Sequence, residues 1–243
     1  MRTIKGTTEN ETNIIKAIQN ALKIDPDGCI GESTLTSIAA KVKADCWPCT
    51  ISIYGNPVII CKDIDFSCVR TSLNRHGNSI SGTFNNGKSV CSILVNNGNV
   101  VCGNSCHFYD GEGYPETVLF RSSGGIVEAR RVKTVGELPE SFVWAVGGLG
   151  LLGFYAPSVE GFKGRFSDVL RKTNHTVLGV KDNLMYLCYM RDMSAEKVNN
   201  TVKKMGLEYA VMLDGGHYAA INGSEQFAKI NLTQAQLCVI KAV

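Results

Sequence analysis

The sequence predicts an α+β fold: a strand-rich, mixed-sheet domain with few helices, preceded by a small N-terminal helical hairpin. From Cys46 onward, runs of β-branched and aromatic residues alternate with short turns of Gly, Asn and Pro, which is typical of strands. Before that point, apolar residues recur at helical spacing on either side of a glycine-rich turn. A chain of 243 residues is long enough for one sizeable core and a small module. We therefore expect one domain over residues 1–45 and another over residues 46–243.

The first 45 residues are expected to form a helix, a glycine turn and a second helix. In the first helix, apolar residues stand at positions 14, 15, 18 and 22, and Thr8 with Glu11 has the spacing of a capping box. The segment "DPDGCIGE" then breaks the helix. The second helix has Ser33 as its cap and apolar residues at positions 35, 38, 39 and 42.

The remainder of the chain is expected to alternate strands with tight turns. Three strand pairs are predicted, turning at Gly55-Asn56-Pro57, Asn96-Asn97-Gly98 and Lys181-Asp182-Asn183. One helix is predicted over 195–205, with Ser194 as its N-cap and Gly206 at its end. A buried strand over 209–213 follows directly. Many strands with few helices favour the α+β class.

Charge and hydropathy exclude several classes of protein. The formal net charge is only +3, and the basic residues are scattered, so the sequence gives no electrostatic reason to expect a nucleic acid polymer as partner. No apolar run reaches the roughly 18 residues of a membrane-spanning candidate. The start, "MRTIKGTTENETN", lacks the apolar core of a secretory signal peptide. We therefore expect no membrane association and a cytoplasmic location.

The ten cysteines are expected to be reduced, because nothing marks the chain for an oxidising compartment. Two pairs are closely spaced, in "CWPC" and in "CGNSCH". Together they could supply four ligands to a structural zinc ion, and buried free thiols are the alternative. The four residues in question are Cys46, Cys49, Cys102 and Cys106.

A glycine motif at residues 148–153 fits the dinucleotide-binding pattern G-x-G-x-x-G and follows the apolar run "FVWAV". However, Pro157 and the polar segment "SVEGF" stand where the phosphate-binding helix should run. We expect these glycines to let the backbone turn tightly at the edge of a pocket.

Polar residues gather where strands are predicted to end. The run "AVMLDGGHYAAING" stops being apolar at Asp214, and two glycines separate this carboxylate from His217. His107 in "GNSCH" and His175 in "RKTNHTVLG" likewise lie close to Gly or Asn near predicted strand ends, where sheets often present chemistry. Further polar candidates are Glu116, Arg121, Glu160, Asp168 and Arg171, of which Asp168 and Arg171 could instead form an ion pair.

The first 45 residues resemble the peptidoglycan-binding module of cell-wall hydrolases. The resemblance covers about 35 residues and rests on Gln19, Leu22, Asp27, Gly28, Gly31, Thr34 and Leu35. It implies binding to peptidoglycan, and the alternative is that the turn glycines serve only the backbone geometry.

Residues 46–243 resemble the phosphodiester glycosidase domain, the family of the enzyme that uncovers mannose 6-phosphate and of many bacterial and phage proteins. The motifs are "SGTFNNG", "ILVNNGNVVCG", "WAVGGLGLL", "HTVLG" and, most specifically, "LDGGH" after a helix and a strand. The resemblance implies a phage or bacterial protein, located in the host cytoplasm or associated with the phage.

Several positions depart from the family pattern. His175 stands where the family has Arg, His217 where it has a third Gly, and Ser81 where it has Asn, whereas Phe84, Thr176, Gly179 and Asp214 match. The resemblance implies Asp214 as the carboxylate that activates water or stabilises positive charge, with His175 and His217 as donors or acids toward phosphate. The substrate-binding residues that we expect beside them are Ser81, His107, Arg121, Gly148, Thr176, Gly215, Gly216 and Asn222. No cofactor is expected; a divalent metal at the His and Asp cluster is the alternative.

The expected function is hydrolysis of a glycosidic phosphodiester, in a cell-wall polymer or in a nucleotide-type signal molecule. The alternative is a non-catalytic protein that sequesters a phosphorylated sugar or cyclic nucleotide, or a phage virion or wall-binding component. Either function requires a small phosphorylated sugar or nucleotide as partner, with peptidoglycan as a further candidate. The sequence leaves the oligomeric state open.

Overall fold

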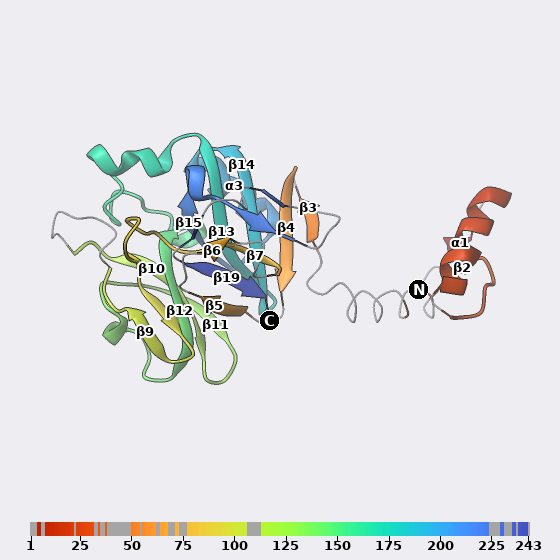
Figure 1. Ribbon diagram of the computed structural model, residues 1–243, viewed down its shortest axis with the longest axis horizontal. Coiled ribbons are helices and arrows are strands. Elements are labelled where there is room, and N and C mark those ends of the chain that lie inside the picture. The colour runs from red at the N-terminus through yellow and green to blue at the C-terminus, as the bar shows by residue number, and fades with distance from the viewer. Residues whose placement is uncertain are drawn as a thin grey trace. The chain divides into compact units, whose positions relative to one another are not determined.

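The chain divides into two compact units, Met1–Cys49 and Thr50–Val243, in the computed structural model (Figure 1). The structure describes residues 4–5, 8–21, 23–31, 34, 37, 50–53, 55–61, 64–67, 71–72, 77–105, 113–223, 229–230, 235–236 and 238–242. The assignment of these units as a wall-binding module and a glycosidase domain remains a prediction.

The first unit contains one long helix, α1 (Glu9–Ala21), and a two-residue antiparallel pairing of β1 (Ile4–Lys5) with β2 (Cys29–Ile30). The predicted capping box is present: the Glu11 amide donates to the Thr8 hydroxyl, and the Thr8 amide donates to the Glu11 carboxylate, both at 3.2 Å. The buried face of α1 differs from the predicted stripe, because Ile14 and Ile18 are exposed whereas Ile15 is buried. Most of the second predicted helix lies outside the described residues.

A single buried amide organises the glycine turn after α1. The Gln19 Nε2 group lies 2.7 Å from Asp27 Oδ1 and 3.1 Å from Thr34 Oγ1, and Gln19 Oε1 accepts from the Gly28 amide at 2.9 Å. Gly28 has φ +74°, which favours glycine, and a Cβ there would lie 2.8 Å from a methyl group of Thr12. Four residues of the peptidoglycan-binding resemblance, Gln19, Asp27, Gly28 and Thr34, are therefore joined by hydrogen bonds inside this unit.

The second unit is built around a ten-stranded antiparallel sheet (Figure 1). Eight of its strands lie side by side in the order β11-β10-β12-β15-β13-β14-β4-β3. The other two, β8 and β9, form a hairpin in which β8 also pairs with β12. The strands are β3 (Thr50–Ile53), β4 (Asn56–Cys61), β8 (Leu94–Asn96), β9 (Asn99–Cys102), β10 (Glu116–Ser122), β11 (Val127–Val132), β12 (Phe142–Gly150), β13 (Thr173–Lys181), β14 (Leu184–Met193) and β15 (Tyr209–Gly215).

A second antiparallel sheet has the order β17-β16-β7-β19-β5, and β18 pairs separately with β6. The remaining strands are β5 (Ile64–Ser67), β6 (Thr71–Ser72), β7 (Ser79–Ser81), β16 (Ile221–Asn222), β17 (Lys229–Ile230), β18 (Ala235–Gln236) and β19 (Val239–Ala242). Ile80, Ile221 and Ile240 from this second sheet join Leu178 and Val211 of the large sheet in one buried cluster. The core thus lies between the two sheets.

The opposite face of the large sheet is covered by α3 (Ala195–Met205) and neighbouring short 3-10 helices. Val198 and Val202 of α3 pack with Val177 and Met212 of the sheet. Of the short helices, η3 (Leu152–Phe154) and η4 (Gly164–Leu170) contribute side chains to this cluster. The others are η2 (Val135–Glu137) and η5 (Gly216–Tyr218). Two of the short helices, η4 and η5, matter for function because they provide part of the wall of the pocket described below.

Local chemistry explains why these elements begin and end where they do. Asn97 and Gly98 both have positive φ in the turn between β8 and β9, as do Asp182 and Asn183 between β13 and β14, which suits tight hairpins. Ser194 caps α3 by accepting from the Lys197 amide. These two hairpins and the helix match their predictions.

Two of the three glycines of the apparent dinucleotide motif, Gly148 and Gly150, lie inside β12 rather than at a turn, which corrects our prediction for them, whereas Gly153 lies in η3. A Cβ on Gly148 would lie 2.6 Å from the Met212 carbonyl oxygen, and one on Gly150 would lie 2.3 Å from Thr117 Oγ1. Glycine at these two positions therefore allows close approach of neighbouring elements, because any larger residue would push them apart.

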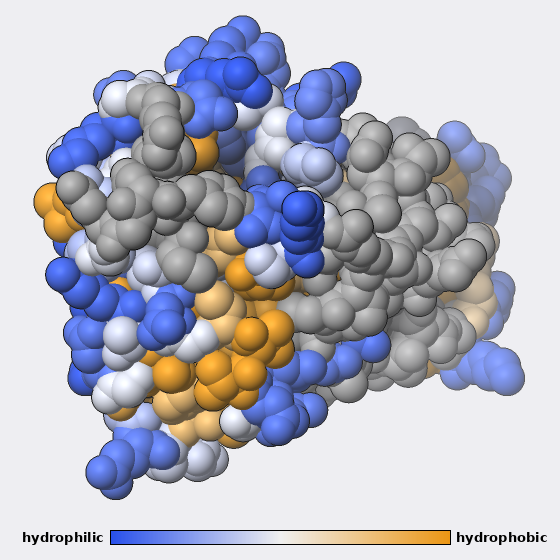
Figure 2. All heavy atoms as spheres, turned by 60° about the vertical axis from the view of Figure 1, so that its left-hand side comes forward, coloured by the Kyte–Doolittle hydropathy of each residue, from blue (hydrophilic) through white to orange (hydrophobic). Residues whose placement is uncertain are grey.

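The α+β class with few helices is confirmed, but the sheets are not mixed. Every strand pairing among the described residues is antiparallel. Helix α3 connects β14 to β15 along the chain, and these two strands lie on opposite sides of β13 in the sheet. No helix in the described part of the chain is long and apolar enough to cross a membrane. Figure 2 shows hydrophobic side chains gathered on one face, and the exposed ones in the structure include Val100 and Val101 of β9.

Candidate functional site

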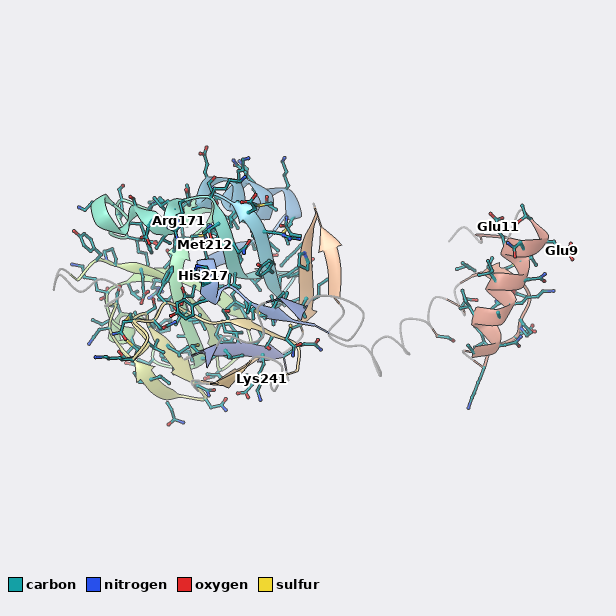
Figure 3. The ribbon with its side chains drawn as sticks, turned by 45° about the horizontal axis from the view of Figure 1, so that its top comes forward. Glu9, Glu11, Arg171, Met212, His217 and Lys241 are labelled. Atoms are coloured by element: carbon teal, nitrogen blue, oxygen red, sulfur yellow. The ribbon has the colours of Figure 1, made fainter. Side chains whose placement is uncertain are left out.

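A pocket of about 250 Å³ opens beside the ends of β13 and β15. Side chains and backbone from four parts of the chain line it: the segment after β7, the η4 helix with the residue that follows it, the start of β13, and the junction of β15 with η5. Arg171 and His217, labelled in Figure 3, lie on this part of the molecule. The lining residues are Phe84, Asp168, Val169, Arg171, Thr173, His175, Asp214, Gly215, Gly216, His217 and Tyr218.

A β-bulge places Asp214 in this pocket. In the pairing of β13 with β15, Val177 stands opposite Met212 and His175 stands opposite Gly215, so two residues of β15 face the single residue Thr176. A bulge of this kind redirects side chains and is common beside active sites. The apolar run therefore ends at Asp214 because the strand leaves its regular ladder at that residue.

The Asp214 carboxyl group is held by two donors. Its Oδ1 accepts from the Gly215 amide at 2.8 Å, and its Oδ2 accepts from Asn85 Nδ2 at 2.6 Å. Burial of the carboxyl raises the pKa of Asp214 to about 7, although the Gly215 amide acts in the opposite direction by stabilising the ionised form. An acid with a pKa near neutrality can both take up and release a proton at physiological pH.

The backbone beneath Asp214 is fixed by buried hydroxyl groups. Thr176 Oγ1 donates to the Asp214 carbonyl at 2.8 Å, and the Asp214 amide donates to the Gly82 carbonyl at 3.1 Å. Ser81 Oγ accepts from the Ala220 amide at 2.9 Å and donates to the Tyr218 carbonyl. Ser81 and Thr176, which we expected to bind substrate, thus hold the strands that carry the site.

His175 is enclosed in the pocket wall and is only 1% exposed. Its Nε2 atom lies 2.9 Å from the Met193 carbonyl oxygen and 3.3 Å from the Arg171 carbonyl oxygen. Burial lowers the pKa of His175, and the positive charge of Arg171 lowers it further, whereas the two carbonyl contacts act against this change.

The rim of the pocket carries exposed polar groups of both signs. Arg171 follows η4 as its C-cap, Asp168 lies in the last turn of that helix, and His217 lies in η5. All three line the pocket. The pocket therefore combines an enclosed carboxyl group with charged and hydrogen-bonding groups that reach solvent.

Other residues that we expected at the site lie elsewhere. Gly148 stands next to Met212 within the sheet, and Arg121 lines a separate cavity of about 20 Å³ together with Trp144 and Asn183. Asn222 donates to the Gly77 carbonyl. His107 lies outside the described residues, as do Cys46, Cys49 and Cys106 of the zinc alternative.

Two further candidates, Glu116 and Glu160, belong to buried networks of the sheet. Glu160 accepts from Thr117 Oγ1 at 2.5 Å, from Arg131 Nε at 2.9 Å and from the Gly150 amide at 2.9 Å. Burial raises its pKa against these stabilising contacts. The Glu116 carboxylate accepts from the Ile93 amide and packs against Gly147. Neither carboxylate lines the pocket.

Asn85, which was not among the predicted site residues, binds Asp214 directly. The only signal was its position next to Phe84 in "SGTFNNG", where Asn-Asn-Gly indicates a turn. Asn85 serves that turn as well, because its Oδ1 accepts from the Gly87 amide at 2.9 Å. Thr173 and Tyr218 also line the pocket and were not predicted.

The described residues contain no group of three His, Cys, Asp or Glu side chains placed to hold a metal ion. Asp214, His175 and His217 line one pocket, but the His175 Nε2 atom is turned toward two carbonyl oxygens. The cysteines in the described part of the chain are free thiols, namely Cys29, Cys61, Cys91, Cys102, Cys188 and Cys238.

No family model and no curated protein matches the chain. Its fold is similar to that of the zebrafish N-acetylglucosamine-1-phosphodiester alpha-N-acetylglucosaminidase catalytic domain, solved in a form auto-inhibited by its pro-peptide, with a TM-score of 0.58. The sequences are 14% identical, and the likeness covers 79% of this chain and 80% of that one. A hypothetical protein from Synechocystis is similar with a TM-score of 0.51 and 11% identity, over 79% of this chain and 60% of that one.

Proposed function

We propose that this chain is a hydrolase that cleaves a glycosidic phosphodiester, the bond between the anomeric carbon of a sugar and a phosphate oxygen. The observation that carries the proposal is the Asp214 carboxyl group, enclosed at a β-bulge, held by two donors and with its pKa raised to about 7. The similarity in fold to a phosphodiester glycosidase supports the same reaction class.

The reaction would place the sugar beside Asp214. The bond from the anomeric carbon to the phosphate oxygen breaks, the electron pair leaves with the phosphate, and positive charge develops on the sugar. The ionised Asp214 carboxylate can stabilise that charge or take a proton from the water that adds to the anomeric carbon. Asn85 and the Gly215 amide would keep the carboxylate in one orientation during this step.

The leaving phosphate needs neutralisation of charge more than it needs a proton. Arg171 at the rim offers a permanent positive charge with several donors, which suits phosphate oxygens. His217, also at the rim, can donate a hydrogen bond to the same group. Arg171 thus replaces Arg121, which lines the other cavity, as a candidate for phosphate binding, and His217 keeps the role expected for it.

A binding protein that does not cleave its ligand is the second candidate. The observation in its favour is that Asp214 is half-buried and that the other carboxyl group among the described residues of the pocket, that of Asp168, is exposed at the rim. Glycosidases usually use two carboxyl groups. A pocket with one half-buried carboxyl group could hold a phosphorylated sugar or nucleotide without turnover.

The test uses the purified full chain and three families of probe: N-acetylglucosamine 1-phosphodiesters, lipoteichoic acid fragments and cyclic ADP-ribose species. Products are sought by mass spectrometry, and binding of the intact probe is measured by calorimetry. The proposal expects release of a sugar and a phosphate product by the wild type, with Asp214→Asn at least about a hundredfold slower. The matched control is Asp182→Asn in the exposed hairpin turn, which should keep full activity.

Binding of a probe without any product would favour the second candidate. Activity that survives in Asp214→Asn would place the chemistry elsewhere and refute the proposed role of this carboxyl group. The probe that reacts would also decide between a wall polymer and a nucleotide signal.

Wall binding by residues 1–45 is a separate proposal that rests only on the sequence resemblance. The bonds of Gln19 to Asp27, Gly28 and Thr34 account for those residues through the folding of the unit itself. Co-sedimentation of the full chain with purified peptidoglycan, compared with a chain that begins at residue 46, tests the proposal. Equal sedimentation of the two chains would refute it.

A further inference from the structure

The hydrogen bonds of His175 define which of its ring nitrogens carries a proton. Nε2 faces the carbonyl oxygens of Met193 and Arg171, at 2.9 Å and 3.3 Å. A carbonyl oxygen can only accept, so Nε2 must be the donor. The neutral ring is then the tautomer with its proton on Nε2 and a lone pair on Nδ1.

The surroundings of Nδ1 do not favour a second proton. Nδ1 is buried and has no hydrogen-bond partner among the described residues. It lies against β15, where a Cβ built on Gly215 would be 3.1 Å away. A proton on Nδ1 would therefore be a buried donor without an acceptor, which is costly. Burial and the charge of Arg171 also lower the pKa of His175, which likewise favours the neutral ring.

The neutral ring contacts three elements, η4, β14 and β15, and residues at the ends of η4 and β15 line the pocket. Through Nε2 it holds the Arg171 carbonyl at the end of η4 and the Met193 carbonyl at the end of β14. Its other edge packs on Gly215, its partner in the pairing of β13 with β15. Glycine at 215 is what permits this contact, because a side chain there would meet both the ring and the Asn174 carbonyl oxygen at 2.9 Å.

We propose that His175 is a positioning residue whose neutral ring holds the Gly215 amide against the Asp214 carboxyl group. The inference rests on the proposed function for its catalytic meaning, since it concerns the carboxyl that we place at the reaction. It replaces the role that we expected for His175, a charged donor toward phosphate, because a neutral ring with Nε2 bound to two carbonyl oxygens cannot supply positive charge to a ligand.

The effect passes through one hydrogen bond. The Gly215 amide donates to Asp214 Oδ1 at 2.8 Å and stabilises the ionised carboxylate. If the His175 ring no longer supports Gly215, this donor moves away while the carboxyl remains enclosed. Asp214 should then be harder to ionise.

The first experiment measures the ring itself. In the full-length protein labelled with ¹⁵N-histidine, two-bond correlation spectra near pH 7 distinguish a protonated nitrogen from one with a lone pair. We expect His175 to show a proton on Nε2 and none on Nδ1. A ring protonated on both nitrogens, or on Nδ1 alone, would overturn the proposal.

The second experiment measures the consequence for Asp214. The carboxyl carbon of Asp214 is titrated by ¹³C NMR in the wild type, His175→Gln and His175→Leu. Gln keeps an N–H donor for the carbonyl oxygens, so its midpoint should stay near that of the wild type. Leu fills the space without a donor, so the midpoint should rise by about one pH unit.

If the Leu variant fails to fold, Gly215→Ala tests the same contact by changing the residue that packs against the ring, because its methyl group would push the His175 ring and β15 apart. Its Asp214 midpoint should also rise. An unchanged or lowered midpoint in the folded Leu or Ala variant would overturn the proposal. Neither experiment uses a substrate, so a failure of the proposed function in the activity assay leaves this result separate.

Discussion

Replacing Asp214 by Asn should destabilise the protein at low pH and leave it equally or more stable than the wild type at high pH. The wild-type carboxyl group has its pKa raised from an ordinary 3.8 to about 7, so the folded protein keeps the proton over a range in which the unfolded chain has lost it. Stability must fall with increasing pH across that range, because the unfolded state binds fewer protons there. Asparagine does not titrate and escapes this loss.

The magnitude follows from the displacement of the pKa. A change from 3.8 to about 7 corresponds to about 4 kcal/mol of folding free energy, lost between the two values and fully lost above the upper one. The substitution also has a cost that does not depend on pH. Asn85 donates from Nδ2 to Asp214 Oδ2, and its own Oδ1 already accepts from the Gly87 amide. The side-chain N–H donor of an asparagine at position 214 would therefore find no free acceptor on Asn85. Such an unsatisfied donor should lower the free energy of unfolding by about 1–3 kcal/mol.

The balance predicts a crossover. Near pH 4.5 the variant should be less stable than the wild type by about 1–3 kcal/mol, and near pH 8.5 it should be equally or more stable, with a relative gain of about 3 kcal/mol between the two conditions. Urea unfolding followed by circular dichroism at both pH values measures this gain. Asp182→Asn is the control, because its exposed turn position should give the same difference at both. A stability difference for Asp214→Asn that does not depend on pH would refute the enclosed, hard-to-ionise carboxyl group.

Three other predictions concern the scaffold. Gln19→Leu should unfold the first unit or destabilise it by at least about 2 kcal/mol, since it removes the polar contacts of the glycine turn, and loss of amide protection over residues 9–21 in hydrogen exchange would report it. Gly148→Ala should lower the free energy of unfolding by about 1–3 kcal/mol, and with it the melting temperature, because its methyl group would meet the Met212 carbonyl. Gly153→Ala should be neutral, because nothing lies within 4 Å of a Cβ at that position. Equal melting temperatures for the two variants would contradict the packing role of Gly148. Iodoacetamide should label Cys102 in the native protein and Cys61 only after unfolding, because burial raises the pKa of the Cys61 thiol far above its ordinary value, and peptide mapping would show a failure as early labelling of Cys61.

The parts of the fold that were predictable from sequence are those fixed by residues close together in the chain. The turn between β13 and β14 needs positive φ at two positions, and Asp182 and Asn183 tolerate it. The ends of α3 are set by Ser194 and Gly206 at its two caps. In each case the required conformation and the residue that accepts it lie in the same short segment.

The glycines of β12 show where such local reasoning fails. Gly148 and Gly150 suggest a turn when only their neighbours in the chain are considered, because glycine accepts most backbone conformations. Their actual constraint comes from Met212 and Thr117, which belong to other strands. No spacing within the motif could reveal that contact.

The candidate site divides in the same way. Asp214 could be predicted because an apolar strand ends there at two glycines. Its partner Asn85 lies 129 positions away in the chain and could not. The contacts of His175 could not be predicted either, since the carbonyl oxygens of Arg171 and Met193 that lie against its Nε2 atom are backbone groups, which any residue type could have supplied.

The bulge in β15 also bears on how such a site can be gained or lost. Deleting one residue between Met212 and Gly215 would give β13 and β15 equal numbers of residues, and the ladder on either side of Thr176 could close into a regular one. A single-codon deletion would then remove the carboxyl group from the pocket while the sheets and their core kept their register. Divergent chains could therefore retain this architecture after the catalytic carboxyl group has been lost. Conversely, protein design could introduce a carboxyl group at the edge of a regular sheet by inserting one residue at the same point.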